Sequence, residues 1–414
     1  MQIYLDHSAT TPPRSEVIAV MQQALASDWG NPSSLHAWGK RAATWVETAR
    51  LQVAASVNAP PESIAFTSGG TESNNWVFAG IQQRVSDSKP SNRSNPSAQS
   101  NQSDQSAPHV IISQIEHSAI RRPAQALEQQ GWRVTYLPVD RMGRLDPQRL
   151  AAAIAPETVL VSLIYGQSEV GTLQPIAELA AIARERGVLF HTDAVQVMGR
   201  VTIDLESLPV DFLSMSSHKL YGPKGVGALY IRPGCKLAPL LLGGGQESGL
   251  RSGTQAVPNI AGFGVAAELA MQERVIEVPR LERLRDRLFD RLAHRHELQP
   301  TGHREQRLPH HVSFCLIDPL LQESGITGQS LVKQLDLAGI AASSGSACNS
   351  GTIAPSAVLT AMGYDDRTAR GALRLTLGRD TTEADIDWTV IAIEQILDRL
   401  QPKTRPVRPH LIAP

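Results

Sequence analysis

Short runs of β-branched and other apolar residues alternate with amphipathic stretches over residues 110–231. The strand-like runs are VIIS at 110–113, RVTYL at 133–137, TVLVSLI at 158–164, VLFHTD at 188–193, DFLSMS at 211–216 and VGALYI at 226–231. Between two of them, a stretch over 175–186 places Ile176, Leu179 and Ile182 at helical spacing. Strands that alternate with helices are typical of an α/β sheet whose strands are mostly parallel.

The pattern changes after Gly262 to a long charged helix at 278–295, a strand-like run at 310–317 and a helix at 329–338. A closing helix begins with Thr382-Glu383-Ala384-Asp385, which is a capping-box pattern. This change predicts a second, smaller domain. We place the large domain at 15–262 and the small domain at 1–14 and 263–414.

The segment 86–108 is rich in serine and contains no aromatic residue and no aliphatic residue larger than alanine or proline. Such a segment cannot bury enough surface to offset its ordering entropy. We therefore expect a disordered insertion on the surface of the large domain.

Composition and charge exclude several classes of protein. The chain has 414 residues, and its 39 basic and 40 acidic side chains give a formal charge of -1, which argues against a binder of nucleic acid that relies on a general basic field. It has no unbroken apolar stretch of the roughly 18 residues that a membrane helix needs, and no secretory signal. Its three cysteines show no C-x-x-C spacing, so we expect no metal site. These observations predict a cytoplasmic enzyme that binds neither nucleic acid nor membrane.

Candidate chemistry starts with Lys219, which lies in SMSSHKLYGPKGVG after a strand-like run and before a turn rich in Gly and Pro. Beside Ser216 and His218 it is placed in a cleft, although taken alone it could be an ordinary surface lysine. Asp193 ends another predicted strand, where a buried carboxylate is costly unless it meets a cation such as a pyridinium nitrogen. Gln196 follows and can hydrogen-bond a phenolate oxygen.

The segment FTSGGTESNN at 66–75 predicts a strand end, two glycines and a helix that begins near Thr71. Glycine lets the backbone approach an anion, and the free N–H groups of a helix N-terminus bind phosphate. The segment is neither a Walker A loop nor a G-x-G-x-x-G fingerprint, which disfavours nucleoside triphosphates and dinucleotides. A phosphate site, a lysine for a Schiff base and an aspartate for a ring nitrogen together indicate pyridoxal 5′-phosphate.

The three cysteines differ in their surroundings. Cys348 lies in SSGSACNSG at 343–351, which has nothing apolar to bury it. We expect this loop to be exposed and mobile, which suits a reactive thiol. Cys315, in HVSFCLI, fits a small buried hydrophobic residue, and Cys235 is interpreted as incidental.

The chain resembles the cysteine desulfurases of the NifS/IscS type, which are fold-type I pyridoxal-phosphate enzymes of the class-V aminotransferase superfamily. The resemblance rests on nine segments in the same order: YLDHSATTPP, GNPSSLHAWGK, FTSGGTESNN, EHSAI, HTDAVQVMGR, SMSSHKLYGPKGVG, GLRSGTQ, SSGSACNSG and ALRLTLGR. It implies a large domain with a mostly parallel seven-stranded sheet and a smaller α+β domain that carries the Cys348 loop.

The resemblance also implies a role for each site residue. Lys219 would form the Schiff base and move the Cα proton, and Arg374 would clamp the substrate carboxylate. His117 would stack on the cofactor ring and assist proton transfer. The other cofactor contacts would come from Gly70, Thr71, Ser216 and His218 at the phosphate, Thr254 of a partner subunit at the same phosphate, Asp193 at the ring nitrogen and Gln196 at the ring oxygen.

The sequence departs from the pattern of the relatives at several positions, among them Gln246, Ser248 and Asn349, and one departure lies at an expected site residue. Where they carry N-N-E-I-G, this chain has QSEVG at 167–171, so Ser168 replaces an asparagine expected near the ring oxygen and the substrate carboxylate. Serine still donates one hydrogen bond but has a shorter reach. We expect weaker substrate binding or altered tuning of the cofactor.

The implied reaction removes sulfur from L-cysteine, releases L-alanine and leaves a persulfide on Cys348. The resemblance further implies a homodimer and an iron-sulfur scaffold or another sulfur-acceptor protein as partner. A cysteine or cystine C–S lyase and a selenocysteine lyase are the alternatives within this fold, and neither needs the loop cysteine. A non-catalytic dimer that binds scaffold proteins is the alternative from another class.

Overall fold

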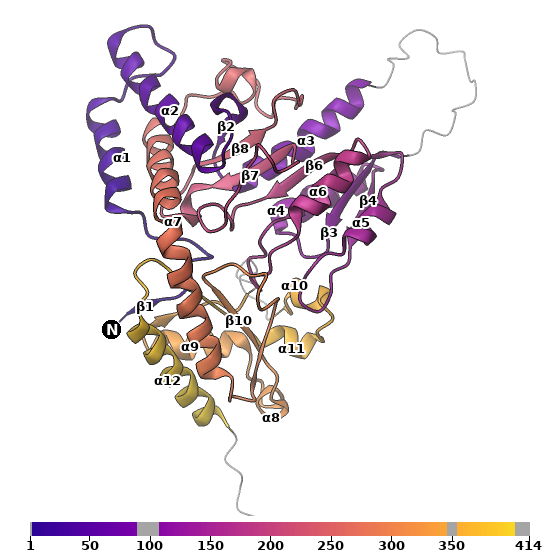
Figure 1. Ribbon diagram of the computed structural model, residues 1–414, viewed down its shortest axis with the longest axis vertical. Coiled ribbons are helices and arrows are strands. Elements are labelled where there is room, and N and C mark those ends of the chain that lie inside the picture. The colour runs from indigo at the N-terminus through magenta and orange to yellow at the C-terminus, as the bar shows by residue number, and fades with distance from the viewer. Residues whose placement is uncertain (1, 89–106, 346–353, 402–414) are drawn as a thin grey trace, which may run out of the picture.

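The computed structural model describes residues 2–88, 107–345 and 354–401 (Figure 1). Its largest element is a seven-stranded sheet with the order β2-β8-β7-β6-β5-β3-β4. The strands are β2 (Ile64–Thr67), β3 (His109–Ser113), β4 (Arg133–Leu137), β5 (Thr158–Ile164), β6 (Leu189–Asp193), β7 (Phe212–Ser216) and β8 (Gly227–Ile231). β8 runs antiparallel to both of its neighbours, β2 and β7, and the other pairs in this sheet are parallel. The expected mostly parallel seven-stranded sheet is confirmed.

All six strands predicted from apolar runs are present, each within one residue of its expected ends. The central strands are buried on both faces, which is why their sequences are almost continuously apolar. Successive residues of β3 point to opposite faces, so Ile111 and Ile112 belong to different hydrophobic clusters.

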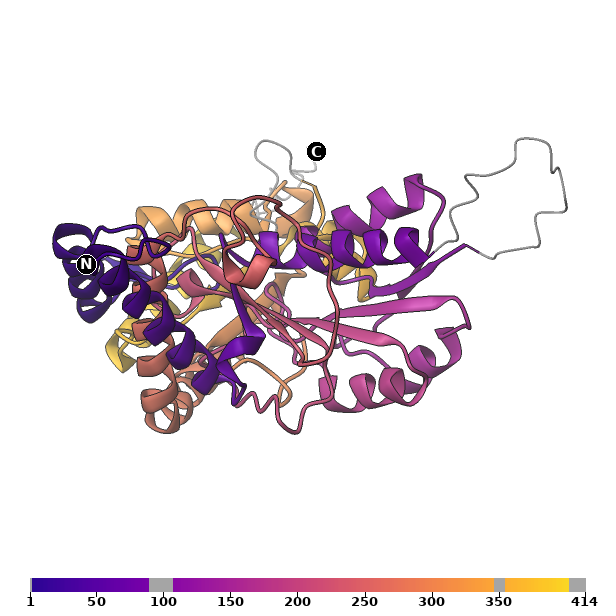
Figure 2. The ribbon, with the colours of Figure 1, turned by 90° about the horizontal axis from the view of Figure 1, so that it is seen from above.

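Helices cover both faces of this sheet. They are α1 (Ser15–Ser27), α2 (Ala37–Ser56), α3 (Gly70–Ser88), α4 (Ser118–Gln129), α5 (Pro147–Ala153) and α6 (Ile176–Glu185). Figure 2 shows α3 and α4 on one side of the sheet and α5 and α6 on the other. The prediction that disorder begins at Ser86 is wrong for the first residues, because α3 continues to Ser88. Residues 89–106 of that predicted insertion lie outside the described part of the chain.

The C-terminal third, together with the N-terminal strand β1, builds two smaller sheets. One has the order β12-β10-β9, from β9 (Leu298–Pro300), β10 (His311–Leu316) and β12 (Ala372–Thr376), and the other pairs β1 (Ile3–Tyr4) with β11 (Ile340–Ala341). The surrounding helices are α8 (Pro319–Glu323), α9 (Gly328–Leu337), α10 (Ala357–Ala361), α11 (Asp366–Arg370) and α12 (Glu383–Leu400). The capping box predicted at Thr382 and Asp385 is present at the start of α12.

A single long helix, α7 (Val257–Leu292), connects the two regions (Figure 1). Its first half buries Phe263 in the core of the large sheet, and its second half buries Leu288 in the core around the smaller sheets. The helix begins well before the charged stretch at 278–295 from which it was predicted, and Pro279 lies inside it. The predicted boundary at residue 262 falls within α7, and the domain division stays a prediction.

Within the described part of the chain, no helix is both long and apolar enough to cross a membrane.

Candidate active site

The predicted site residues gather where parallel strands of the large sheet end. Asp193 is the last residue of β6, Ser216 is the last residue of β7, and a single turn of 3-10 helix then carries Ser217–Lys219. β6 and β7 are paired, so both groups reach the same edge of the sheet. Ligands of open α/β sheets bind outside the carboxyl ends of the strands.

Asp193 is buried and held by two hydrogen bonds. The Asn74 side-chain amide donates to Oδ2 at 2.7 Å, and the Val195 N–H donates to Oδ1 at 3.0 Å. Neither donor carries a charge, so the carboxylate still has no cationic partner of its own in the described part of the chain. Sequence reasoning missed Asn74, although it lies inside the predicted phosphate segment. This arrangement allows the Asp193 carboxylate to pair with the protonated ring nitrogen of a bound cofactor.

The start of α3 lies against the end of β7. A Cβ atom on Gly70 would come within 2.6 Å of a Val195 methyl and 3.7 Å of the Ser216 Cβ, so only glycine fits without displacing Val195. Gly69 has a φ of +149°, a conformation that side chains rarely adopt. Glycines therefore bring the N-terminus of α3, with Thr71, close to Ser216, as a phosphate cradle requires.

Lys219 is mostly buried. Its Nζ donates to the carbonyl oxygens of Ser8 at 2.6 Å and Ala9 at 2.7 Å. Burial, with Arg374 and Arg200 as nearby cations, lowers the pKa of Lys219 to about 8. A lysine with this pKa is partly unprotonated near neutral pH, as a nucleophilic amine needs to be.

Gln196 and Lys219 are joined through the backbone. The Gln196 side-chain amide donates to Ser8 O at 2.9 Å, while its Oε1 is buried without a partner among the described residues. The buried Arg200 donates to Lys219 O at 2.7 Å and to Gln196 O at 3.3 Å. Arg200 therefore ties together the two turns that present these side chains.

The segment Asp6–Thr11 contacts both regions of the protein, and sequence reasoning gave it no site role. Thr10 Oγ1 lies 3.1 Å from His218 Nδ1, and Thr11 Oγ1 donates to His218 O at 2.9 Å. Burial, with Lys219 nearby, lowers the pKa of His218 to about 4, so this ring is neutral. The motif YLDHSATTPP contributed to the family resemblance, but it did not indicate which residues this segment contacts.

Arg374 comes to this edge from β12. Its Nη2 donates to Asp6 Oδ1 at 2.7 Å and its Nη1 donates to Ser168 O at 3.1 Å, while the buried Nε has no partner among the described residues. The structure thus brings Arg374 beside Ser168 and close enough to Lys219 to affect its pKa. The free Nε suits a guanidinium that binds a further carboxylate.

His117 caps α4 and is exposed at the same edge. Its Nδ1 accepts from Ala119 N at 3.1 Å, which leaves Nε2 to carry the proton. Ser118 and Thr71 line one pocket, so the starts of α4 and α3 are neighbours. The preceding residue, Glu116, is fully buried, and burial raises the pKa of its carboxyl to about 8.

The described residues do not bring every predicted group into the site. Thr254 is exposed, and its expected role across a dimer stays a prediction.

Cys348 lies outside the described residues. Cys315 is fully buried, as predicted, and burial raises its pKa to about 12, while burial and Asp211 raise the pKa of Cys235 to about 11. Neither of these two thiols is activated as a nucleophile.

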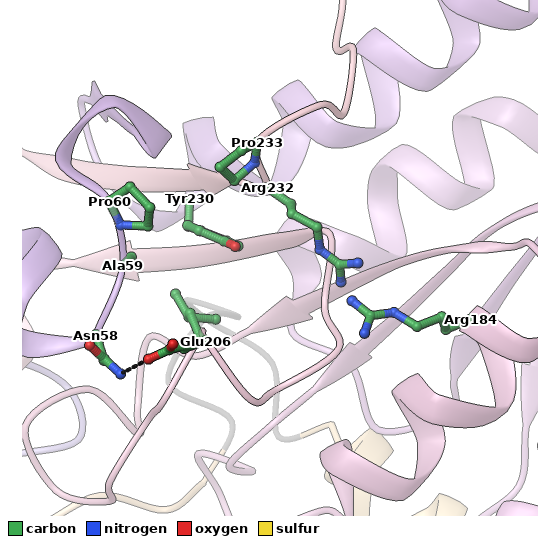
Figure 3. Close-up of a pocket in the computed structure, with 9 residues that line it drawn as sticks. Asn58, Ala59, Pro60, Arg184, Glu206, Tyr230, Arg232 and Pro233 are labelled. Carbon is green, nitrogen blue, oxygen red and sulfur yellow. Dashed lines mark hydrogen bonds between the residues drawn. The ribbon is translucent and has the colours of Figure 1, made fainter.

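A separate pocket opens elsewhere on the large sheet (Figure 3). It is lined by Asn58, Ala59, Pro60, Arg184, Leu205, Glu206, Tyr230, Arg232 and Pro233. None of these is a predicted site residue. Arg232 already donates to Val210 O and lies 3.6 Å from Asp211, so its charge is balanced locally.

The residues at the sheet edge fit pyridoxal phosphate. The carboxylate of Asp193 can accept from a protonated ring nitrogen, the Gln196 side-chain amide can donate to the ring oxygen, and the glycine-lined start of α3 supplies N–H groups for the phosphate. Within the described part of the chain, no group of three or more His, Cys, Asp and Glu side chains is arranged to hold a metal ion.

Comparison with known proteins agrees with this arrangement. The model of the family described as aminotransferase class-V matches residues 3–92 and 95–388. The cysteine desulfurase IscS of Dictyoglomus turgidum is 41% identical over 401 residues, covering 97% of this chain and 95% of that protein. A solved NifS-like protein superposes with a TM-score of 0.85 at 34% identity, over 96% of this chain and 100% of that one. SspA, solved in complex with cysteine, gives 0.75 at 30% identity, over 91% and 99%. The chain therefore belongs to the class-V aminotransferase family of pyridoxal-phosphate-dependent enzymes.

Proposed function

We propose that this protein is a cysteine desulfurase that takes the sulfur of L-cysteine, releases L-alanine and carries the sulfur as a persulfide on Cys348. One observation supports this above all: Lys219, Asp193 and Arg374, from distant parts of the sequence, meet at one edge of the large sheet. The relatives over nearly the full length are named cysteine desulfurases, and a similar structure holds cysteine.

When bound, pyridoxal phosphate supplies an electron sink for the pair of electrons left on Cα. The Asp193 carboxylate would accept a hydrogen bond from the protonated ring nitrogen, and the Gln196 side-chain amide would donate its second N–H to the ring oxygen. The phosphate would lie at Gly70, Thr71, Ser216 and His218, joined by Thr254 of a partner subunit. His117 would stack on the ring, since it starts α4 beside the start of α3.

Lys219 would carry the cofactor and then move the substrate proton. Its pKa of about 8 leaves enough free amine near neutral pH for both tasks. The carbonyl oxygens of Ser8 and Ala9 accept two hydrogen bonds from Nζ, which stabilise the ammonium after it has taken the proton from Cα.

Arg374 would bind the carboxylate of L-cysteine. It is 5% exposed and keeps a free Nε, so an incoming carboxylate meets a desolvated guanidinium. Ser168, in place of the asparagine of relatives, contacts Arg374 through its carbonyl oxygen only. That shorter side chain supports the expectation of weaker substrate binding.

The Cys348 thiolate would attack the sulfur of the bound substrate. An S–S bond forms as the C–S bond breaks, the electron pair stays with the carbon, and protonation of that carbon gives alanine. The resulting persulfide would pass to an iron-sulfur scaffold or another sulfur-acceptor protein. We also propose that the enzyme is a homodimer, as its resemblance to NifS/IscS enzymes implies, and that it works in the cytoplasm, as its composition predicts.

The test is a product assay on the cofactor-loaded protein with L-cysteine and a reductant, in which alanine, pyruvate and sulfide are measured together. Cys348→Ala is assayed in parallel, with Cys235→Ala as the matched control. Alanine equal to sulfide, lost only in Cys348→Ala, is the expected result. Pyruvate with sulfide, unaffected by either substitution, would indicate a C–S lyase, and no product at all would indicate a non-catalytic dimer.

A further inference from the structure

Asp6 is the one carboxylate that Arg374 contacts in the described part of the chain. The distance from Nη2 to Asp6 Oδ1 is 2.7 Å, and the two side chains are 6% and 21% exposed. Such a partly buried, charge-assisted contact is strong and geometrically demanding. Asp6 lies near the N-terminus and was not among the site residues expected from the sequence.

The two partners belong to one rigid unit. Asp6 forms a parallel bridge with Thr376, two residues beyond Arg374 on β12, and Thr376 N donates to Leu5 O at 2.7 Å. The Asp6 carbonyl oxygen accepts from Ala9 N at 3.0 Å. The backbone of Asp6 is therefore held in place independently of the ion pair that its side chain makes.

The contacts of Arg374 leave one nitrogen of the guanidinium without a partner in the described part of the chain. Nη2 is occupied by Asp6 and Nη1 by the Ser168 carbonyl, two fixed points that set the plane of the group. Nε is buried and has no partner among the described residues. A buried donor without a partner is costly unless a ligand satisfies it, so this edge is the one that meets a carboxylate.

We propose that Asp6 is a positioning residue that orients Arg374 and so sets how tightly the site binds the α-carboxylate of its amino-acid substrate. The inference rests on the proposed function of Arg374. Asp6 does not touch the substrate in this arrangement, and it acts by fixing the direction in which Nε points.

The opposite effect of Asp6 is also physically possible and gives the test its second outcome. A carboxylate that occupies Arg374 could compete with the substrate, and its removal would then tighten binding. The fixed backbone of Asp6 and the free Nε favour positioning over competition, because the substrate does not need to displace Asp6.

The experiment compares two amines in cofactor-loaded Asp6→Asn and wild-type protein. The dissociation constants of L-alanine and of ethylamine, which lacks the carboxylate, are measured from the absorbance change of the bound cofactor. Asp387→Asn, which removes a carboxylate that pairs with Arg287 and Arg291 on α7, is the matched control. The ratio of the two constants isolates the contribution of the carboxylate from any general change in the site.

In Asp6→Asn we expect the L-alanine constant to rise about tenfold, the size of one misplaced charge-assisted hydrogen bond, while the ethylamine constant stays unchanged. An unchanged ratio, or tighter binding of L-alanine, would overturn the role of Asp6 alone. A wild-type protein with no preference for L-alanine would overturn the role of Arg374 as well, so the two failures are distinguishable.

Discussion

The interior of the large sheet and its carboxyl edge differ in whether their buried polar groups have hydrogen-bond partners. In the interior, His191 lies between Ser162 Oγ at 2.8 Å and Ser214 Oγ at 2.9 Å. His109 lies between two threonine hydroxyls in the same manner. Burial lowers the pKa of His191 to about 3 and that of His109 to about 4, so both rings stay neutral with both nitrogens paired.

At the edge, buried polar atoms remain without partners. Nine such atoms occur in the described part of the chain, and five belong to residues at or directly beside the candidate site. These five are Asn74 Oδ1, Glu116 Oε2, Gln196 Oε1, Ser217 Oγ and Arg374 Nε. Since buried polar groups are ordinarily satisfied, this concentration marks the region that is built to receive a ligand.

The largest expected effect comes from Lys219→Ala, which removes the buried amine that we propose carries the cofactor. We expect activity to fall at least about 10³-fold, because both covalent attachment and proton transfer depend on that amine. The visible absorbance of the loaded protein should be lost as well. Lys224→Ala, in the same turn, is the control and should keep both, and a coloured, active Lys219→Ala protein would remove the lysine from the mechanism.

Glu116→Gln tests the buried carboxyl behind the site. The folded protein keeps Glu116 protonated up to its pKa of about 8, whereas the unfolded chain ionises near 4.5, so the wild type loses stability as the pH rises between these values. The amide cannot ionise. Relative to the wild type, the free energy of unfolding of the variant should therefore increase by on the order of 3 kcal/mol from pH 5 to pH 8.

Urea unfolding at pH 5, 6.5 and 8 measures this difference, with the exposed Glu62→Gln as control. A difference that does not change with pH would mean that Glu116 is ionised in the folded protein throughout this range.

The smallest expected effect comes from a pair of variants, one at the carboxyl edge of the sheet and one in its interior. Asn74→Ala removes the amide that holds Asp193, and we expect the dissociation constant of the cofactor to rise about fivefold to tenfold. Ser162→Ala leaves His191 Nδ1 unpaired in the interior and should lower the free energy of unfolding by about 1–3 kcal/mol without changing cofactor affinity. Equal changes in cofactor affinity for the two variants would contradict the distinction between interior and edge.

The strands of the large sheet could be predicted because their apolar runs are long and bounded by turns. Their order in space, and the antiparallel direction of β8, could not, since pairing depends on contacts between distant segments. The length of α7 was underestimated because Gly262, Gly264 and Pro279 suggest breaks, while packing against α1 and α2 keeps the helix continuous.

The site was predictable where a residue type has few uses at a strand end, as with Asp193 and Lys219. The residues that hold these site side chains in place could not be recognised from the sequence. Asn74, Arg200 and Asp6 are common residue types, and only the tertiary structure shows that they hold Asp193, Lys219 and Arg374. The expectation for Cys348 lies outside the described residues and stays a prediction.

The contacts of the N-terminal segment have a consequence for the order in which the protein can be completed. Ser8 N donates to Thr376 Oγ1 across 368 residues, so this contact of the N-terminal segment cannot form before β12 has been synthesised. Such non-local closure is slow compared with the folding of local helices. All seven strands of the large sheet precede β12 in the chain, so Arg374 meets Asp6 only after the residues of that sheet have been synthesised.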